Sequence, residues 1–92
     1  MGQAVVTFKV MPESPEVDLD ELESFSKQHI NDFCDPDELK VKHEPVAFGL
    51  KALVIQFVME EDQGNTDDLE ATIGDHDNVR NAETTDVRRA FG

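Results

Sequence analysis

Reactive side chains in this sequence do not occur in the spacings that catalytic sites use. There is no glycine-rich phosphate loop, no GxSxG segment and no plausible pairing of a cysteine with a histidine. The 21 acidic side chains are so numerous that choosing any two as general acid and base would be arbitrary. We therefore expect no catalytic residues, and we expect that the protein is not an enzyme.

Three further features could suggest metal or thiol chemistry, but each has a simpler interpretation. Asp75, His76 and Asp77 are consecutive, and three consecutive side chains do not readily converge on one ion, so a solvated loop is expected. His29 lies near the edge of an apolar helical stripe and is interpreted as a boundary residue. Cys34 is the only cysteine, which predicts an ordinary buried or half-buried thiol. We predict no metal and no cofactor.

The stretch that favours a function runs from Pro45 to Glu60. It contains the densest apolar segment of the chain, between a proline-containing loop and an acidic, glycine-containing loop, which is typical of a central strand. Just before that strand, Phe48 is followed by Gly49. A large apolar ring beside a residue that is free to adopt positive φ can form a protruding, exposed tip. The residues alone leave an alternative equally open, in which Phe48 folds back onto its own hairpin.

Composition limits the classes of partner. The 92 residues carry a formal net charge of -13, which argues against nucleic acid because phosphate binding needs clustered cations. Disorder is not expected, since 38% of the residues are hydrophobic and occur in periodic runs. No segment indicates a signal peptide or a membrane span. We predict one folded domain over residues 1–92, in a cytoplasm of high salt that screens its acidic surface.

Six segments have the periodicity of secondary structure. They are a strand at residues 4–10, a helix between Asp18 and Asp35, a short strand at residues 39–44, the long strand after Gly49, a short helix ended by Gly74, and a strand at residues 79–87. The lysines of the second strand are typical of a sheet edge. This order predicts an α+β fold of the ferredoxin-like, split βαβ type (β-α-β-β-α-β). In that fold a four-stranded antiparallel sheet has strands one and three in the middle and both helices on one face.

The ends of these segments are predicted from local chemistry. Residues 11–15 contain two prolines and should end the first strand. Asp18 should cap the first helix, with Glu21 completing a capping box. Asn65 or Thr66 should cap the second helix. The first helix should direct one apolar face to the core, with Leu19, Leu22, Phe25, Ile30 and Phe33, and the second should carry Leu69, Ala71 and Ile73.

Three blocks of sequence carry a resemblance to a known family. They are residues 9–19 (KVMPESPEVDL), residues 45–53 (PVAFGLKAL) and residues 85–89 (TDVRR). In their order and spacing they resemble the archaeal translation elongation factor 1-beta family. The resemblance spans nearly the whole chain. It implies a ferredoxin-like guanine nucleotide exchange factor whose partner is the elongation factor 1-alpha GTPase, acting in the cytoplasm and monomeric when free.

The resemblance also implies which residues bind the partner. They are Pro45, Val46, Ala47, Phe48, Gly49, Lys51, Thr85, Asp86, Arg88 and Arg89. Eukaryotic relatives place a lysine near their last residue, whereas the last three residues here are alanine, phenylalanine and glycine. The two arginines either engage the partner or only offset local negative charge. A rival from another class is a ferredoxin-like regulatory domain that binds a small ligand and self-associates.

Overall fold

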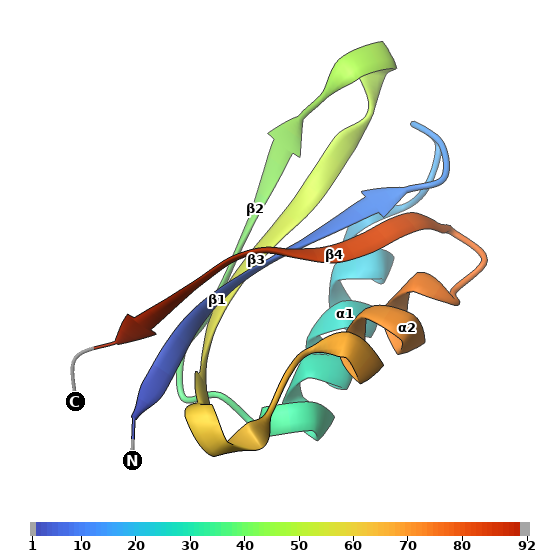
Figure 1. Cartoon of the computed structure of the whole chain (residues 1–92). Coiled ribbons are helices and arrows are strands. Elements are labelled where there is room, and N and C mark those ends of the chain that lie inside the picture. Colours follow the sequence, from blue (N-terminus) through green and yellow to red (C-terminus); the bar gives the residue numbers. More distant parts are fainter. Residues whose placement is uncertain (1, 91–92) are drawn as a thin grey trace.

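The computed structural model describes residues 2–90 and contains the six predicted elements in the predicted order (Figure 1). The elements are β1 (Gln3–Pro12), α1 (Leu19–Cys34), β2 (Leu39–Pro45), β3 (Lys51–Glu60), α2 (Asp67–Gly74) and β4 (Val79–Ala90). A short 3₁₀ turn precedes β3 (Ala47–Gly49) and another follows it (Glu61–Gln63). The predicted α+β class is confirmed.

The four strands form one antiparallel sheet in the order β2-β3-β1-β4. The two most apolar strands, β1 and β3, therefore lie in the middle, as predicted, and β2 lies at an edge. Both helices cover the same face of the sheet, and its other face carries no helix (Figure 1). Neither α1 nor α2 is long and apolar enough to cross a membrane.

The core lies between the sheet and the two helices. Alternate residues of the central strands point into it, and Val6, Phe8 and Val10 are completely buried. The helices contribute four buried apolar residues: Leu22 and Ile30 from α1, and Leu69 and Ile73 from α2. Ala71, the remaining predicted apolar residue of α2, is exposed. Only the residues at 69 and 73, four apart, share the inward face of this short helix.

The first strand is three residues longer than predicted, by one residue at its start and two at its end. Met11 and Pro12 remain in β1, and Pro12 pairs with Val79 after a shift of register between Met11 and Pro12. A proline cannot donate to the strand ladder, but it is tolerated at such an irregularity near a strand end. The chain leaves the sheet one residue later, because the N–H of Glu13 still donates to the carbonyl of Asn78 over 2.8 Å.

The two ends of α1 follow local chemistry. The Asp18 carboxylate accepts hydrogen bonds from the backbone N–H groups of Asp20 and Glu21, at 3.0 and 3.3 Å. This confirms the predicted cap. At the other end Asp35 adopts a left-handed conformation, with φ of 43°, and its N–H donates to the carbonyl of Asn31. The helix stops at the predicted turn because an Asp side chain tolerates this conformation better than most residues do.

The start of α2 is tied to the neighbouring strand. Asn65 provides the side-chain cap, since its Oδ1 accepts from the N–H of Asp67 at 3.0 Å. The Thr66 hydroxyl instead shares a hydrogen bond of 2.6 Å with the hydroxyl of Thr84 on β4. The Glu70 carboxylate accepts from the backbone N–H of Thr84 at 2.6 Å. Asn65, rather than Thr66, is therefore the side-chain cap, and Thr66 joins the helix to the sheet.

The acidic surface predicts a strong dependence of stability on salt. The net charge of -13 places the folded chain under self-repulsion that dilute buffer screens only weakly. We expect molar KCl to add about 2 kcal/mol to the free energy of unfolding, which raises Tm by roughly 8–16 °C for a domain of this size. Thermal melts in 0.05 and 2 M KCl measure the change. Sucrose, which does not screen charge, is the control, and an equal gain in sucrose would contradict the electrostatic explanation.

Candidate partner-binding site

The hairpin that joins β2 to β3 ends in a closed, ordered tip. The N–H of Val46 donates to the carbonyl of Leu50 at 2.8 Å, and the N–H of Leu50 donates to the carbonyl of Ala47 at 3.2 Å. Between these bonds Phe48 and Gly49 both have positive φ, of 61° and 75°. Consecutive residues of this kind reverse the chain tightly. The tip is therefore fixed by backbone hydrogen bonds.

Phe48 lies at the outermost point of this tip. Its side chain is 92% exposed, so the alternative in which the ring folds back onto its own hairpin is wrong. The sequence predicted positive φ at Gly49 but not at Phe48. A left-handed phenylalanine costs roughly 1–2 kcal/mol. The chain thus keeps a large apolar ring in water and in a strained backbone conformation, a combination that is typical of a binding residue.

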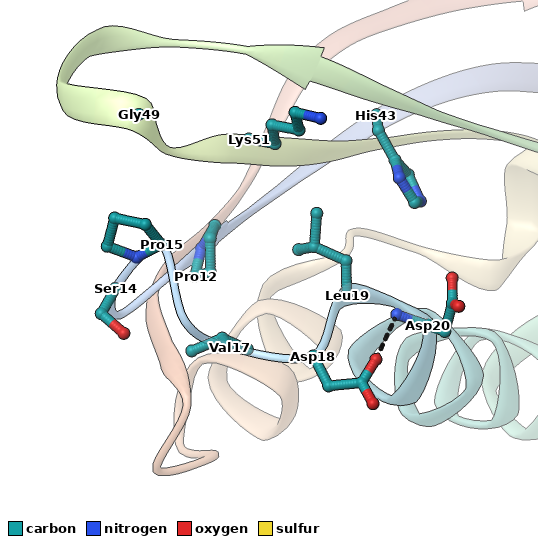
Figure 2. A pocket seen from close by; sticks show the side chains of 10 residues that line it. All are labelled: Pro12, Ser14, Pro15, Val17, Asp18, Leu19, Asp20, His43, Gly49 and Lys51. Carbon is teal, nitrogen blue, oxygen red and sulfur yellow. Dashed lines mark hydrogen bonds between the residues drawn. The ribbon is translucent and has the colours of Figure 1, made fainter.

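A cleft of about 350 Å³ lies beside the hairpin (Figure 2). One wall is the connection from β1 to α1 and the other is the hairpin itself. The lining residues are Pro12, Ser14, Pro15, Val17, Asp18, Leu19, Asp20, His43, Gly49 and Lys51. Two of the three sequence blocks described above, residues 9–19 and 45–53, therefore meet at this cleft. The sequence did not predict this, because the two blocks are about 30 residues apart in the chain.

Strand register decides which side of the sheet the hairpin cations occupy. Lys51 pairs with Pro45, two residues before the buried Leu53, so it lies on the helix-covered side, next to the cleft. Lys40 and Lys42 pair with Gln56 and Val54 on the helix-free side. Lys51 therefore lies on the opposite face of the sheet from Lys40 and Lys42.

A cluster of Asp20, Glu23 and His43 joins α1 to the base of the hairpin. Potential metal-ligating atoms of these three residues lie within 4.8 Å of one another. Glu23 Oε1 lies 3.1 Å from His43 Nε2, and Glu23 Oε2 lies 2.9 Å from Lys27 Nζ. The hydrogen bond from Lys27, assisted by His43, lowers the pKa of Glu23. Both carboxylate oxygens are already in contact with protein groups, so we assign the cluster to linking helix and strand. No sequence motif indicates it.

The other two candidate groups, the Cys34 thiol and the loop around His76, have structural explanations. Burial, together with the nearby Asp35 carboxylate, raises the pKa of the Cys34 thiol to about 11. The thiol is therefore protonated and weakly nucleophilic at neutral pH, in agreement with the predicted half-buried thiol. In the Asp75–Asp77 loop, His76 Nδ1 accepts from the N–H of Asn78 at 3.0 Å, and its ring packs against that of Phe25 at an interplanar angle of 60°. This histidine orders a turn at the end of α2.

The C-terminal candidates form a second group on β4. Arg88 Nε donates to Asp86 over 2.9 Å, and Arg89 Nε donates to Glu61 over 2.8 Å. Adjacent residues of a strand point to opposite faces, so the two arginines do not form one cationic patch. The register of β4 shifts between Thr84 and Asp86, which leaves Thr85 as the extra residue of a bulge. The Thr85 hydroxyl donates to the carbonyl of Thr7 at 3.3 Å.

The structure does not bring the two predicted groups together. On β1, Val10 lies opposite Leu53 near the hairpin, whereas Val5 lies opposite Arg88. The hairpin tip and the arginines are thus at opposite ends of the sheet, about 30 Å apart at 3.3 Å per residue. The molecule is 42 Å in its longest dimension, so the candidate residues span most of its length. Phe91 and Gly92 lie outside the described residues.

Fold and site together define a class of protein. The chain is a small split βαβ domain whose distinctive surface feature is an exposed phenylalanine on an ordered hairpin, which is typical of a protein-binding domain. Comparison with known families makes this specific. Residues 5–90 match the model of the EF-1 guanine nucleotide exchange domain. The chain belongs to this family, and it is a guanine nucleotide exchange factor of translation elongation.

Individual relatives agree over nearly the whole chain. Elongation factor 1-beta of Methanothermobacter thermautotrophicus is 42% identical over 89 residues, which cover 97% of this chain and 98% of that protein. Elongation factor 1-beta of Methanobrevibacter smithii is 38% identical over 89 residues, with the same coverage. That of Methanococcus aeolicus is 38% identical over 87 residues, covering 95% and 97%. These matches favour the exchange factor over the regulatory domain considered above.

Proposed function

We propose that this chain, as a single cytoplasmic domain and a free monomer, promotes exchange of GDP for GTP on elongation factor 1-alpha. The family supports the activity and the partner. The exposed ring of Phe48 is the observation that carries the mechanism. The net charge of -13 favours a cytoplasm of high salt and argues against nucleic acid as a direct partner.

The proposed mechanism makes and breaks no covalent bond. An exchange factor must bind the nucleotide-free GTPase more tightly than the GDP-bound form. By linkage, the factor then weakens GDP binding by the same ratio by which GDP weakens binding of the factor. A tenfold change in either affinity, for GDP or for the factor, corresponds to about 1.4 kcal/mol of binding free energy. The chain therefore needs only binding energy that depends on the state of the partner.

Phe48 is suited to supply that energy. Burying a phenylalanine side chain contributes roughly 1.5–3 kcal/mol, which can be used to displace elements of the GTPase that hold GDP. The tip is already ordered by backbone hydrogen bonds at Val46 and Leu50, so little conformational entropy is lost on binding. We propose that Pro45, Val46, Ala47 and Gly49 shape this wedge.

The second candidate group would make a separate contact. Thr85, Asp86, Arg88 and Arg89 lie roughly 20–30 Å from the tip along the sheet. A partner that touched both groups would therefore have to contact the domain along its length. Each arginine is held in a surface ion pair within the chain, with Asp86 or with Glu61. Such exposed pairs are worth little, so the guanidinium groups can be redirected to a partner at small cost.

Substitution of both arginines tests this second contact. We expect Arg88→Ala with Arg89→Ala to weaken binding to nucleotide-free elongation factor 1-alpha by about tenfold, in line with loss of interfacial charge contacts. Arg80→Ala is the control, since Arg80 is an exposed arginine nearer the start of β4. Titration in molar KCl measures the affinities. Equal affinities for the double variant and the control would leave the arginines only a charge-balancing role.

Release of a fluorescent GDP analogue from elongation factor 1-alpha tests the function itself. We expect addition of this chain in molar KCl to accelerate release with a saturable dependence on concentration. In a pull-down, the chain should retain the nucleotide-free GTPase and lose it when GDP is added. A chain that dimerises and ignores nucleotide would instead support the regulatory domain.

A further inference from the structure

The cleft beside the hairpin is not used by the mechanism above, although two of the three family-like sequence blocks meet there (Figure 2). We propose that this cleft is a further contact for the GTPase, and that it receives a segment with an apolar side chain next to a carboxylate. The proposal rests on the proposed function and assigns a role to the connection between β1 and α1.

Part of the cleft lining suits an apolar side chain. Figure 2 shows Pro12 and Pro15 across the cleft from Gly49, with Leu19 projecting toward the hairpin. Pro12 is fully buried, so Pro15 and Leu19 offer the accessible apolar surface, and the N–H of Val17 closes a turn onto the carbonyl of Ser14 at 3.3 Å. Proline rings and a closed turn leave this wall little freedom to lose on binding. The apolar part of the lining is thus already formed.

The charges of the cleft point to a carboxylate. Lys51 is the one lysine or arginine among the residues that line the cleft, and among the described residues it forms no ion pair. The other charged or titratable groups of the walls lie at the α1 end of the cleft: His43 contacts Glu23, Asp18 accepts two backbone N–H groups of α1, and Asp20 lies within 4.8 Å of Glu23 and His43. Lys51 is therefore the cation that is available to a ligand in the cleft. An anionic group of the partner would satisfy it.

The position of the cleft identifies its occupant. Gly49 lines the cleft and directly follows Phe48, the proposed wedge. A protein that buries the Phe48 ring must therefore also approach the rim at Gly49 and Lys51. The cleft is continuous with the proposed interface, and the same GTPase is the partner that reaches both.

Reversing the charge of one lysine tests the carboxylate. We expect Lys51→Glu to weaken binding to nucleotide-free elongation factor 1-alpha by at least about tenfold, because like charges would face each other. Lys42→Glu is the matched control: it makes the same charge change on the same hairpin, on the opposite face of the sheet. It should leave the affinity within about twofold, since a solvated charge outside the contact contributes little.

A second pair of variants tests the proline wall. Pro15 is exposed, so its replacement should not unfold the core. We expect Pro15→Glu to weaken binding by about tenfold through repulsion of the partner's carboxylate, and Pro15→Ala to lose less than threefold, because alanine loses only rigidity. Circular dichroism and Tm confirm that each variant is folded.

The outcomes separate this proposal from the proposed function. Losses in Lys51→Glu and Pro15→Glu, with Lys42→Glu and Pro15→Ala close to the parent chain, would support the cleft contact. Parental affinity in both glutamate variants, with the GTPase still bound and GDP still released, would overturn the cleft contact and leave the exchange function intact. Absence of any binding by the parent chain would overturn both.

Discussion

Replacement of Phe48 by alanine should remove most of the exchange activity and leave the fold intact. The ring is 92% exposed in the free domain, and the proposed interface buries it. Its loss should cost roughly 1.5–3 kcal/mol of binding to the nucleotide-free GTPase, which is a 10- to 150-fold fall in exchange efficiency. Stopped-flow release of a fluorescent GDP analogue, measured below saturation, reports this ratio.

The stability of the Phe48→Ala variant should differ from that of the parent by no more than about 0.5 kcal/mol, as is usual at exposed sites. Alanine retains a Cβ atom and so carries the same strain at φ of 61°. Phe48→Leu is the matched control, because it keeps an apolar side chain and should retain intermediate activity. Parental exchange rates in Phe48→Ala would refute the wedge. A large fall in Tm would show that the ring supports the fold.

Replacement of Phe8 by alanine should have the opposite effect. Phe8 is completely buried at the centre of β1, between its neighbours β3 and β4. Truncating a buried phenylalanine costs about 3–5 kcal/mol, because apolar contacts are lost and a cavity remains. A 92-residue domain has a total stability of only about 5–14 kcal/mol. We therefore expect Tm to fall by at least about 12 °C.

Thermal and denaturant unfolding in molar KCl measure this loss. Phe8→Leu, which removes less volume, should lose clearly less stability than Phe8→Ala. At a temperature where both variants are folded, exchange per folded molecule should equal that of the parent, since Phe8 lies on the buried face. A fall in Tm of less than 3 °C for Phe8→Ala, where roughly 12 °C or more is expected, would contradict the assigned core.

The sequence was sufficient to determine most of the fold. Alternation at Val6, Phe8 and Val10 predicted a strand with one buried face, and these residues are fully buried. Asp18 and Asp35 predicted the ends of the long helix correctly. Such signals are local, because the periodicity of side chains and the capping of helix ends depend on residues a few positions apart. The end of the first strand was misplaced by two residues at Pro12, because the position at which a strand stops pairing depends on its neighbours in the sheet.

The sequence also indicated the candidate wedge, because a large ring beside a glycine before a long strand is a local pattern. It left open whether Phe48 was exposed, and the tertiary structure decided this. It also did not predict the left-handed conformation of that residue. Both properties depend on how the hairpin closes and on what lies near it in space.

The arrangement of the remaining candidate residues was decided by the tertiary structure alone. Strand register placed Lys51 beside the cleft and the arginines at the far end of the sheet. The helix-to-sheet contacts brought Glu23 to His43 and Thr66 to Thr84, pairs that are 20 and 18 residues apart. The sequence by itself thus determined which segments form strands and helices, and it indicated Phe48 as a candidate for binding. Only the folded chain determined which distant residues share a surface, because that depends on register and packing between segments far apart in the sequence.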